Sequence, residues 1–283
     1  MDKPVKTVAA DRALRIEAYH FQGLARPFPL HFHPHYVVGL VERGARRLTC
    51  KGREAALGPG QLFLLNPGDS HACAQCGEEP LDYRSVTLPI ETMLDLAEDL
   101  TGARTLPVFP APVADDPETA CQLRVFHDLI LNGGGRFARE EVLLLLMAGL
   151  LERHSPLPPP AVPACRAEVD HARAYMEAHF AERIGLEQLC RQVGLSKSTL
   201  LRAFTQARGL TPYRYLETVR INAAKRLLEQ GASPLEAALQ TGFSDQSHFT
   251  NYFTSFIGVT PGLYRDILRG RQNEKGEQHG LSE

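Results

Sequence analysis

The spacing of hydrophobic and polar positions changes character near the middle of the chain. Residues 1–154 contain short β-type runs separated by glycine and proline, followed by two helical stretches, whereas residues 166–270 keep helical spacing almost throughout. Residues 155–164 hold five prolines, and such a stretch excludes a helix and favours an extended, semi-rigid conformation. The pattern therefore predicts an α+β protein with two domains joined by a proline-rich linker.

We place the boundaries of the predicted parts where this pattern changes. The N-terminal domain is expected over residues 1–154, the linker over 155–165, the helical C-terminal domain over 166–271, and a flexible polar tail over 272–283. A chain of 283 residues has the length of two ordinary domains of about 100 to 200 residues each.

The N-terminal domain is predicted to contain four short strands and two helices. The strands are expected at residues 37–42, 46–50, 61–65 and 83–88, and turns rich in glycine and proline separate them. Closely spaced short strands of this kind favour a small antiparallel barrel. Helices are expected at about 120–131 and 139–154. The second helix is apolar on nearly every side, which is typical of a helix buried in its domain or shared with a partner subunit.

The C-terminal domain contains an internal duplication. When the sequence is shifted by 49 residues, the motifs Phe-Thr and Gly-x-Thr-Pro in residues 204–212 align with the same motifs in residues 253–261. Each copy has the pattern of a helix, a tight turn with a glycine (Gly194 or Gly242) and a second helix. The second copy opens with Ser-Pro-Leu-Glu at residues 233–236, which is the spacing of a capping box. The sequence thus predicts two helix-turn-helix units, whose second helices can lie in the major groove of DNA.

A long helix is expected between the two units. Thr211 and Pro212 can start it, and it can continue to about Gln230 before Gly231 ends it. About nineteen residues at about 1.5 Å each span roughly 28 Å, which is close to the ~34 Å between major-groove faces one turn apart. The spacing allows both second helices to enter successive segments of the major groove with some bending of the DNA.

Charge is unevenly distributed along the chain. The whole sequence has 31 Lys and Arg against 33 Asp and Glu, a net charge of −2. Residues 183–271 alone contain twelve basic and six acidic residues, a local net charge of +6. This excess indicates a polyanionic partner such as double-stranded DNA. A well-hydrated helical surface is the alternative explanation for the charge taken by itself.

Hydropathy and cysteine content bear on the compartment. The longest apolar run, residues 142–151, is about half of what crossing a bilayer requires, and the N-terminal residues lack the continuous apolar segment of a secretory signal. We therefore expect no membrane span and a cytoplasmic protein. The six scattered cysteines do not resemble a disulfide framework and are expected to be reduced thiols. Cys73 and Cys76 form a solitary CxxC pair, which is either a zinc or redox site or two plain thiols.

The second helix-turn-helix unit carries a highly specific motif. Residues 242–249 spell Gly-Phe-Ser-Asp-Gln-Ser-His-Phe, and Phe253, Gly-Val-Thr-Pro at 258–261 and Tyr264 follow. This series is similar to the signature of the AraC/XylS family of transcription regulators, and the resemblance extends over residues 184–265. It implies a DNA-binding domain with two helix-turn-helix units joined by a long helix. Most members of the family activate transcription, which implies RNA polymerase as a further partner of an activator.

The second helix of each unit supplies the candidate DNA-binding residues. In the first unit they are Lys197, Ser198, Thr199, Arg202 and Thr205, and in the second they are Gln246, Ser247, Thr250 and Asn251. The resemblance implies DNA contacts at these positions. Arg202 is the leading candidate for base reading, because a guanidinium can donate two hydrogen bonds to guanine. The second helix offers amides and hydroxyls suited to adenine or to phosphate oxygens. The alternative for each residue is an exposed side chain that only keeps the surface hydrated.

Aromatic residues on the same helices have another expected role. Phe204, Phe249 and Phe253 recur at helical spacing together with Tyr215 and Tyr264. This spacing predicts that they form the core of the domain and do not stack on bases.

Four histidines form the candidate chemistry of the N-terminal domain. His31, His33 and His35 alternate along an extended segment, which points their imidazoles to one side, and His71 follows a later turn. The pattern is similar to the cupin barrel that many AraC-type regulators carry as an effector domain. In a metal-binding cupin, a glutamate stands four residues after the second histidine, and here that position is Val37.

Three interpretations of these histidines stay open. His31, His33 and His71 could hold zinc or iron, all four with His35 could line a pocket for a small-molecule effector, or they could be ordinary structural residues. No cofactor is expected to be required.

These features together predict a regulator and not an enzyme. The leading hypothesis is a sequence-specific, DNA-binding transcriptional activator that forms a homodimer and is controlled by a small-molecule effector in the N-terminal domain. One alternative is a metal-dependent cupin enzyme or metal sensor fused to a DNA-binding domain. Val37 argues against the enzyme, because it removes the only anionic ligand. Another alternative is an architectural DNA binder without an effector.

Overall fold

The computed structural model of the chain describes residues 4–268. The predicted polar tail, residues 272–283, lies outside the described residues. The structure divides into two compact units. The first comprises the residues up to Pro163 together with Ser196–Arg202, and the second comprises Ala164–Leu195 and the residues from Ala203 onward.

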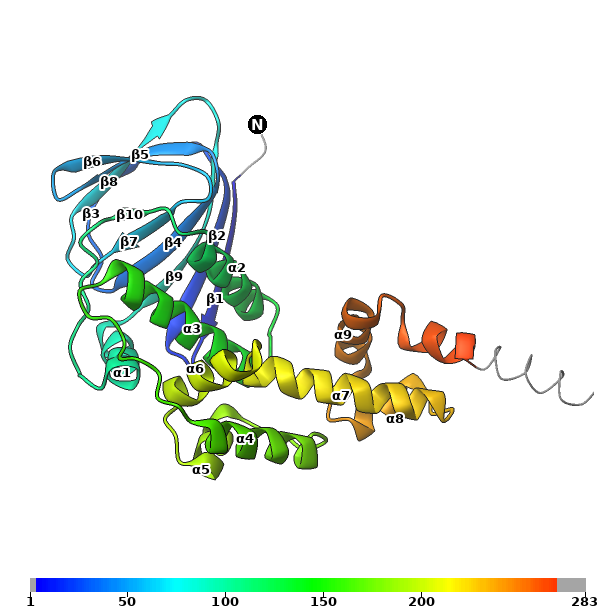
Figure 1. The fold of residues 1–283 in the computed structure, drawn as a ribbon. Helices are drawn as coiled ribbons and strands as arrows, with labels where there is room; N and C mark the ends of the chain where they lie inside the picture. Colours follow the sequence, from blue (N-terminus) through cyan, green and yellow to red (C-terminus); the bar gives the residue numbers. More distant parts are fainter. Residues whose placement is uncertain (1–3, 269–283) are drawn as a thin grey trace, which may run out of the picture. The chain divides into compact units, whose positions relative to one another are not determined.

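Two antiparallel sheets form most of the first unit (Figure 1). The six-stranded sheet has the order β1-β2-β9-β4-β7-β10 and the four-stranded sheet the order β3-β8-β5-β6. The strands are β1 (Val5–Asp11), β2 (Ile16–Leu24), β3 (Phe28–His31), β4 (Tyr36–Arg43), β5 (Ala45–Cys50), β6 (Arg53–Leu57), β7 (Leu62–Leu65), β8 (His71–Cys76), β9 (Leu81–Leu88) and β10 (Val113–Ala114). The four predicted strands are confirmed as β4, β5, β7 and β9.

The predicted antiparallel β architecture is confirmed, but the barrel is not closed. Among the described residues, β1 and β10 end one sheet and β3 and β6 end the other, and no strand pairing joins the two sheets. Two of the edge strands are poorly suited to pairing with the other sheet. Strand β10 has only two residues, and the pairing of β3 with β8 is interrupted by a register shift. The protein therefore forms two facing sheets with free edges.

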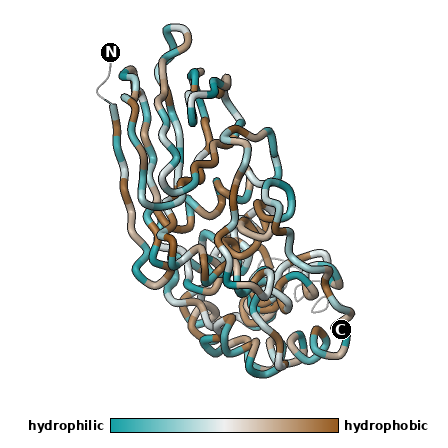
Figure 2. Tube along the Cα trace, turned by 90° about the vertical axis from the view of Figure 1, so that its left-hand side faces the viewer, coloured by the Kyte–Doolittle hydropathy of each residue, from teal (hydrophilic) through white to brown (hydrophobic). Residues whose placement is uncertain are grey.

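The central strands supply much of the core of the N-terminal compact unit. Figure 2 colours hydrophobic residues brown and hydrophilic residues teal; β4 is buried at six consecutive positions, whereas buried and exposed positions are mixed along β2. Leu24, Val41, Leu48, Leu57 and Leu81 form one buried cluster contributed by both sheets. Burial of this kind stabilises the fold by about 1.5–3 kcal/mol per large aliphatic side chain.

A buried arginine also lies within this core. Arg46 is only 1% exposed, and its guanidinium donates hydrogen bonds to the backbone oxygens of Leu24 at 2.6 Å and Ala45 at 2.8 Å. No carboxylate pairs with it in the part of the chain that the structure describes. Backbone carbonyl groups, and not a carboxylate, therefore hold this buried guanidinium.

Three helices complete the first unit. They are α1 (Ile90–Thr101), α2 (Pro117–Leu131) and α3 (Arg136–His154), and the last two confirm the predicted helices. Helix α3 buries residues on most of its sides, including Leu143, Leu144, Leu146 and Met147. Of the two explanations for its apolar sequence, burial within its own chain is therefore sufficient.

Asp116 connects the start of α2 with the end of α3. Its carboxylate accepts hydrogen bonds from the Thr119 amide at 3.0 Å and from the Thr119 hydroxyl at 2.6 Å, which caps α2. Arg153 Nε and His154 Nε2, from the last turn of α3, each lie 2.8 Å from the same carboxylate. One buried anion thus holds the ends of two helices together.

Helices form the rest of the described chain. They are α4 (Arg166–His179), α5 (Leu186–Val193), α6 (Lys197–Arg208), α7 (Pro212–Glu229), α8 (Pro234–Gln240) and α9 (Gln246–Ile257), and residues 261–268 are also helical. Helix α7 has 18 residues, about 27 Å at about 1.5 Å per residue, and it confirms the predicted connecting helix. Helices α4 and α5 lie towards one end of it and α8 and α9 towards the other (Figure 1).

The C-terminal end of the second unit has a well-defined core. Phe243, Phe249 and Phe253 pack with Ile221 and Leu228 of α7. Within the described residues, no helix has both the length and the apolar character that a membrane span needs.

Candidate functional site

The first helix-turn-helix unit is built by α5 and α6. Helix α5 ends at Gly194, which adopts the left-handed conformation with φ 69°, a conformation that costs least for glycine. Ser196 then caps α6, because its hydroxyl oxygen accepts a hydrogen bond from the Thr199 amide at 3.2 Å. The turn predicted from the sequence is therefore present, with the expected glycine and cap.

Helices α8 and α9 repeat this construction. Gly242 in the second turn has φ 79°, and Asp245 caps α9 by accepting from the His248 amide at 2.7 Å. Asp245 and His248 stand 49 residues after the cap residues of the first unit. Helices α6 and α9 each have 12 residues. The two units thus share their local construction as well as their sequence motif.

The glycine of the second turn has an additional constraint. A Cβ at Gly242 would lie 2.8 Å from the carbonyl oxygen of Ala181 and 2.9 Å from that of Phe180. The same Phe180 oxygen accepts a hydrogen bond from Arg220 Nε at 2.8 Å, and Arg220 also donates to the Glu182 oxygen at 2.8 Å. The second turn, the end of α4 and helix α7 therefore meet in one junction that only glycine permits.

The outward face of α9 presents the polar residues predicted from the sequence. Gln246, Ser247 and Asn251 are exposed, and Thr250 is half-buried. Phe249 and Phe253 occupy the opposite side of the helix and are fully buried. The amide and hydroxyl groups therefore lie on the side of α9 that faces away from its core.

The five candidate DNA contacts of the first helix-turn-helix unit all lie on α6. Ser198, Arg202 and Thr205 follow one another at spacings of four and three residues, so they share one side of the helix. Ser198 is buried and donates to the Asp99 backbone oxygen at 2.5 Å, while Arg202 is half-buried and donates to the Pro160 backbone oxygen at 2.8 Å. Lys197 is the first residue of α6, and the Thr199 hydroxyl accepts a hydrogen bond from Ser196 at 2.9 Å. Thr199 is therefore part of the cap as well as a candidate contact.

The aromatic residues of these helices belong to the core, as predicted. Phe204, Phe249 and Phe253 have exposures of 0%. Tyr215 stacks edge-on against Phe204, with ring centroids 5.6 Å apart, and Tyr264 does the same against Phe253 at 5.5 Å. These rings support the two units from inside.

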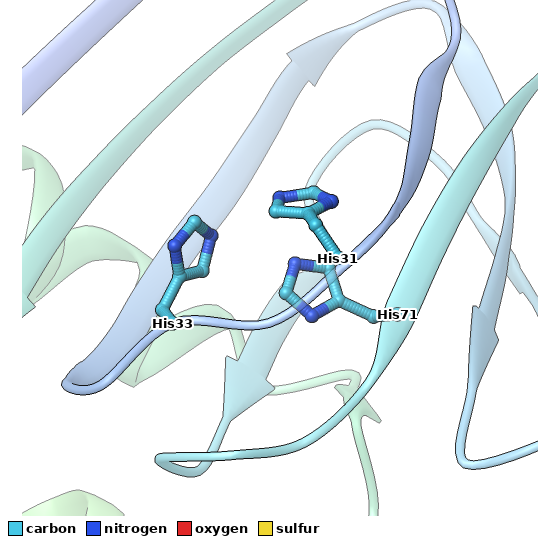
Figure 3. Close-up of side chains that lie close together, drawn as sticks. All are labelled: His31, His33 and His71. Carbon is cyan, nitrogen blue, oxygen red and sulfur yellow. The ribbon is translucent and has the colours of Figure 1, made fainter.

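Three of the predicted histidines lie close together in the N-terminal compact unit, the one that contains the two sheets (Figure 3). His31 ends β3 and pairs across the ladder with His71, the first residue of β8, while His33 lies in the segment after β3. Their ring centroids are 4.3 Å apart for His31 and His71, 4.8 Å for His31 and His33, and 5.1 Å for His33 and His71. One nitrogen from each ring lies within 4.8 Å of one nitrogen from each of the others. His35 stands outside this group and stacks on His33 at 5.1 Å.

Backbone carbonyls orient two of these rings. The Nδ1 atom of His31 lies 2.7 Å from the Pro29 oxygen, and the Nδ1 atom of His71 lies 2.8 Å from the Asp69 oxygen. A carbonyl oxygen only accepts hydrogen bonds, so both Nδ1 atoms carry the proton. In the neutral rings, the Nε2 atoms then keep their lone pairs.

Burial lowers the pKa of His33, His35 and His71 and so favours their neutral form. It lowers the pKa of His33 to about 4, and the neighbouring histidines His71, His31 and His35 lower it further than burial alone would. Burial also lowers the pKa of His71, against the opposing effect of its hydrogen bond to the Asp69 backbone, and it lowers the pKa of His35. Neutral imidazoles are the form that binds metals and accepts hydrogen bonds from ligands.

The histidines line a cavity of about 300 Å³. All four predicted residues, including His35, contribute to its wall, together with side chains from both sheets. None of the described side chains that line it is an aspartate, glutamate, lysine or arginine. Val37, at the position of the cupin glutamate, is 7% exposed and belongs to the apolar lining. The cavity thus has an apolar body and a group of imidazoles as its main polar feature.

Sequence reasoning missed the other walls of this cavity. Tyr19 and Phe21 line it from β2, and Tyr83 lines it from β9. Phe63 also reaches it, and its ring crosses Gly39 so closely that a Cβ there would lie 1.9 Å from the Phe63 Cζ atom. The alternation of Tyr19 and Phe21 within residues 16–24 is the signal that could have identified β2 and this lining.

The two cysteines of the CxxC pair point to opposite faces of the strand that contains them. Both lie in β8, three residues apart, so alternation directs their side chains to opposite faces. Cys73 is buried, lines the cavity and has a pKa that burial raises to about 11. This placement disfavours joint chelation or a thiolate role and leaves Cys73 as an apolar wall residue.

Comparisons with known families match both parts of the chain. A model described as a helix-turn-helix domain matches residues 189–267. A model described as an AraC-like ligand binding domain matches residues 15–148.

Similar proteins cover most of the chain. The uncharacterized HTH-type transcriptional regulator YbfI of Bacillus subtilis (strain 168) is 41% identical over 249 residues, which is 88% of this chain and 90% of that protein. The HTH-type transcriptional activator RhaS of Salmonella schwarzengrund is 28% identical over 86% of this chain and 88% of its own length. A solved transcriptional regulator with an AraC-type DNA-binding domain, from Chromobacterium violaceum, is 30% identical and covers 36% of this chain and 91% of its own, with a TM-score of 0.34.

Proposed function

This chain belongs to the AraC family of helix-turn-helix transcriptional regulators, with an N-terminal ligand-binding domain and a C-terminal DNA-binding domain, and from this premise we propose how its residues perform that function. Helices α6 and α9 are the two DNA-reading helices. A small molecule held in the cavity of the first unit is the effector. The observation that carries the proposal is the pair of helix-turn-helix units with matching caps and turns, together with the exposed polar residues of α9.

Arg202 reads bases in this proposal, and Lys197 contacts phosphate. A guanidinium on a recognition helix can donate two hydrogen bonds to the O6 and N7 atoms of guanine. A lysine in the first turn supplies a point charge to the backbone. The local net charge of +6 over residues 183–271 supports a polyanionic partner for this part of the chain.

Helix α9 reads DNA by a different chemistry. Gln246 and Asn251 are exposed amides, which can donate to and accept from adenine in the major groove. Ser247 and Thr250 can donate to phosphate oxygens and fix the helix in register. In this proposal the two helix-turn-helix units bind DNA through different groups: α6 makes cationic contacts and α9 makes neutral polar contacts.

The effector is a small, largely apolar molecule with a polar head group. A cavity of about 300 Å³ lies at the small end of ordinary ligand pockets, and aromatic and aliphatic side chains form most of its wall. His31, His33, His35 and His71 supply the polar contacts at one part of that wall. Binding regulates DNA recognition if the ligand makes different contacts in two states of the protein.

We also propose that the protein is a homodimeric activator. The relative RhaS is named as an activator, and an activator requires contact with RNA polymerase. Two neighbouring positions on α2 support a subunit interface on that helix: Cys121 is exposed, and Val125, one turn later, is 46% exposed. Light scattering at micromolar concentration, with operator DNA and ligand present, should give a complex whose protein mass, after subtraction of the DNA, is that of two chains. A monomer mass under those conditions would contradict the dimer.

The experiment for the DNA interface compares two arginines. Binding sites are selected from a random duplex library with the full-length protein, and Arg202→Ala is then compared with Arg191→Ala. Arg191 is the matched control because its loss removes the same charge from α5, where it pairs with Glu187 at 3.1 Å. Arg202→Ala should cost about 1–3 kcal/mol of binding at the selected site and relax the preference at one base position. A footprint and base preference unchanged by Arg202→Ala would reject this assignment.

A further inference from the structure

The histidine group in the cavity has the geometry of a metal site. We propose that His31, His33 and His71 bind one divalent transition-metal ion of the zinc class through three imidazole nitrogens, and that the remaining coordination positions of the ion face the cavity. This site goes beyond the regulatory function proposed above, which requires no metal.

The distances between the nitrogen donors support the site. The three donor atoms lie within 4.8 Å of one another. A tetrahedral zinc ion with bonds of about 2.0–2.1 Å to nitrogen holds its ligands about 3.3 Å apart. The group must therefore contract by up to about 1.5 Å, which rotation of the side chains can supply. His33 has the freedom to make this movement, because it lies in the segment between β3 and β4 and outside either strand.

The hydrogen bonds of His31 and His71 prepare these rings for a metal. Each ring donates its Nδ1 proton to a backbone oxygen, of Pro29 and Asp69 respectively, and so has its Nε2 lone pair available. Metal-bound histidines usually make this contact, because it fixes the tautomer and the orientation of the ring. The His33 ring packs against the other histidines but makes no side-chain hydrogen bond to another residue described by the structure, so its nitrogens are available too.

The donor set selects the class of ion. Three imidazoles suit zinc, cobalt, nickel or ferrous iron, whereas calcium and magnesium require oxygen ligands. None of the described side chains lining the cavity is charged, so a bound ion would keep its full positive charge. An anionic oxygen donor, from hydroxide or from the head group of an effector, is therefore the favoured ligand at an open position.

Cobalt absorption provides a direct test on the full-length protein. Protein freed of metal by chelator is titrated with Co²⁺, whose visible bands gain intensity in tetrahedral coordination. We expect the bands to saturate at one equivalent, to disappear when Zn²⁺ is added, and to be absent with Mg²⁺. His33→Gln and His31→Gln should each weaken Co²⁺ binding by at least about tenfold. Two variants are used so that misfolding of one, detected by circular dichroism, leaves the other decisive.

His20→Gln is the matched control. His20 lies on β2 between two residues that line the cavity, so its side chain points to the other face of the strand, where it meets His127 at a centroid distance of 5.7 Å. It should leave Co²⁺ binding unchanged. Absence of the bands, bands that persist in His33→Gln and His31→Gln, or equal loss in His20→Gln would each overturn the metal site. DNA binding by the metal-free protein is measured separately and tests the regulatory function alone.

Discussion

Gly194 and Gly242 occupy the same turn in the two helix-turn-helix units, and replacing each with alanine should have unequal effects. Both adopt the left-handed conformation, with φ 69° and 79°. Nothing lies within 4 Å of a Cβ at Gly194, whereas a Cβ at Gly242 would meet two backbone oxygens at 2.8 and 2.9 Å. The pair therefore separates the conformational cost of alanine from the cost of a close approach.

The expected magnitudes follow from these two contributions. An alanine in the left-handed region costs about 1–2 kcal/mol relative to glycine, and this is the whole effect expected for Gly194→Ala. At Gly242, the end of α4 must also move, and the Phe180 oxygen there is held by the Arg220 guanidinium. Forcing extra atoms into a packed site costs about 1–3 kcal/mol more. Gly242→Ala should thus lower local stability by about 2–5 kcal/mol.

Amide hydrogen exchange on the full-length protein measures these losses separately. The opening free energy of amides in α8 and α9 reports on Gly242→Ala, and that of amides in α5 and α6 reports on Gly194→Ala. The parent protein supplies the reference for both segments. Equal losses, or a larger loss from Gly194→Ala, would refute the steric role of the junction around Gly242.

Two further substitutions test what stabilises the N-terminal compact unit. Burial alone would raise the pKa of the Asp116 carboxyl, but hydrogen bonds from Thr119 and Arg153 outweigh it and hold the pKa well below the usual range. The stabilisation is therefore complete above the unfolded pKa of about 3.9 and is lost as pH falls through the folded value. Asp116→Asn should lower the melting temperature at pH 7, by a gap that narrows below about pH 4; a pH-independent gap would contradict this. Arg46→Met leaves the Leu24 oxygen without its buried donor and should cost about 1–3 kcal/mol in urea unfolding, whereas unchanged stability would show that the guanidinium contributes nothing.

The helical part of the fold was predictable because its signals are local. The proline at position 212, the serine at 233 and the glycines at 194 and 242 act within a few residues of themselves, so the ends of α7, α8 and the two turns could be placed from the sequence. The capping box at Ser233 is present as predicted. Such signals need no knowledge of the tertiary structure.

The sheets were only partly predictable because their signals depend on distant partners. Most residues of β1 are exposed, so this strand lacks the apolar alternation that identifies a half-buried strand. The cavity is harder still, since Tyr19 and Tyr83 reach it from strands that are neighbours in the sheet but distant in sequence. The meeting of His31 and His71 was expected from a resemblance, and it depends on the pairing of β3 with β8.

The duplication itself has a consequence for the DNA that the protein recognises. The residues that shape the two units correspond: a left-handed glycine in each turn, a capped second helix, and buried aromatic rings behind it. The charged residues of the second helices do not correspond, because α6 carries Lys197, Arg202 and Arg208, the last paired with Asp170, while α9 contains no lysine or arginine. Each cationic phosphate contact adds about −0.9 to the slope of log DNA affinity against log salt concentration. The first helix-turn-helix unit should therefore supply most of the salt dependence of DNA binding. Two readers with the same framework and different contact chemistry must prefer different base sequences. The recognised site is therefore expected to consist of two unlike segments about one helical turn apart.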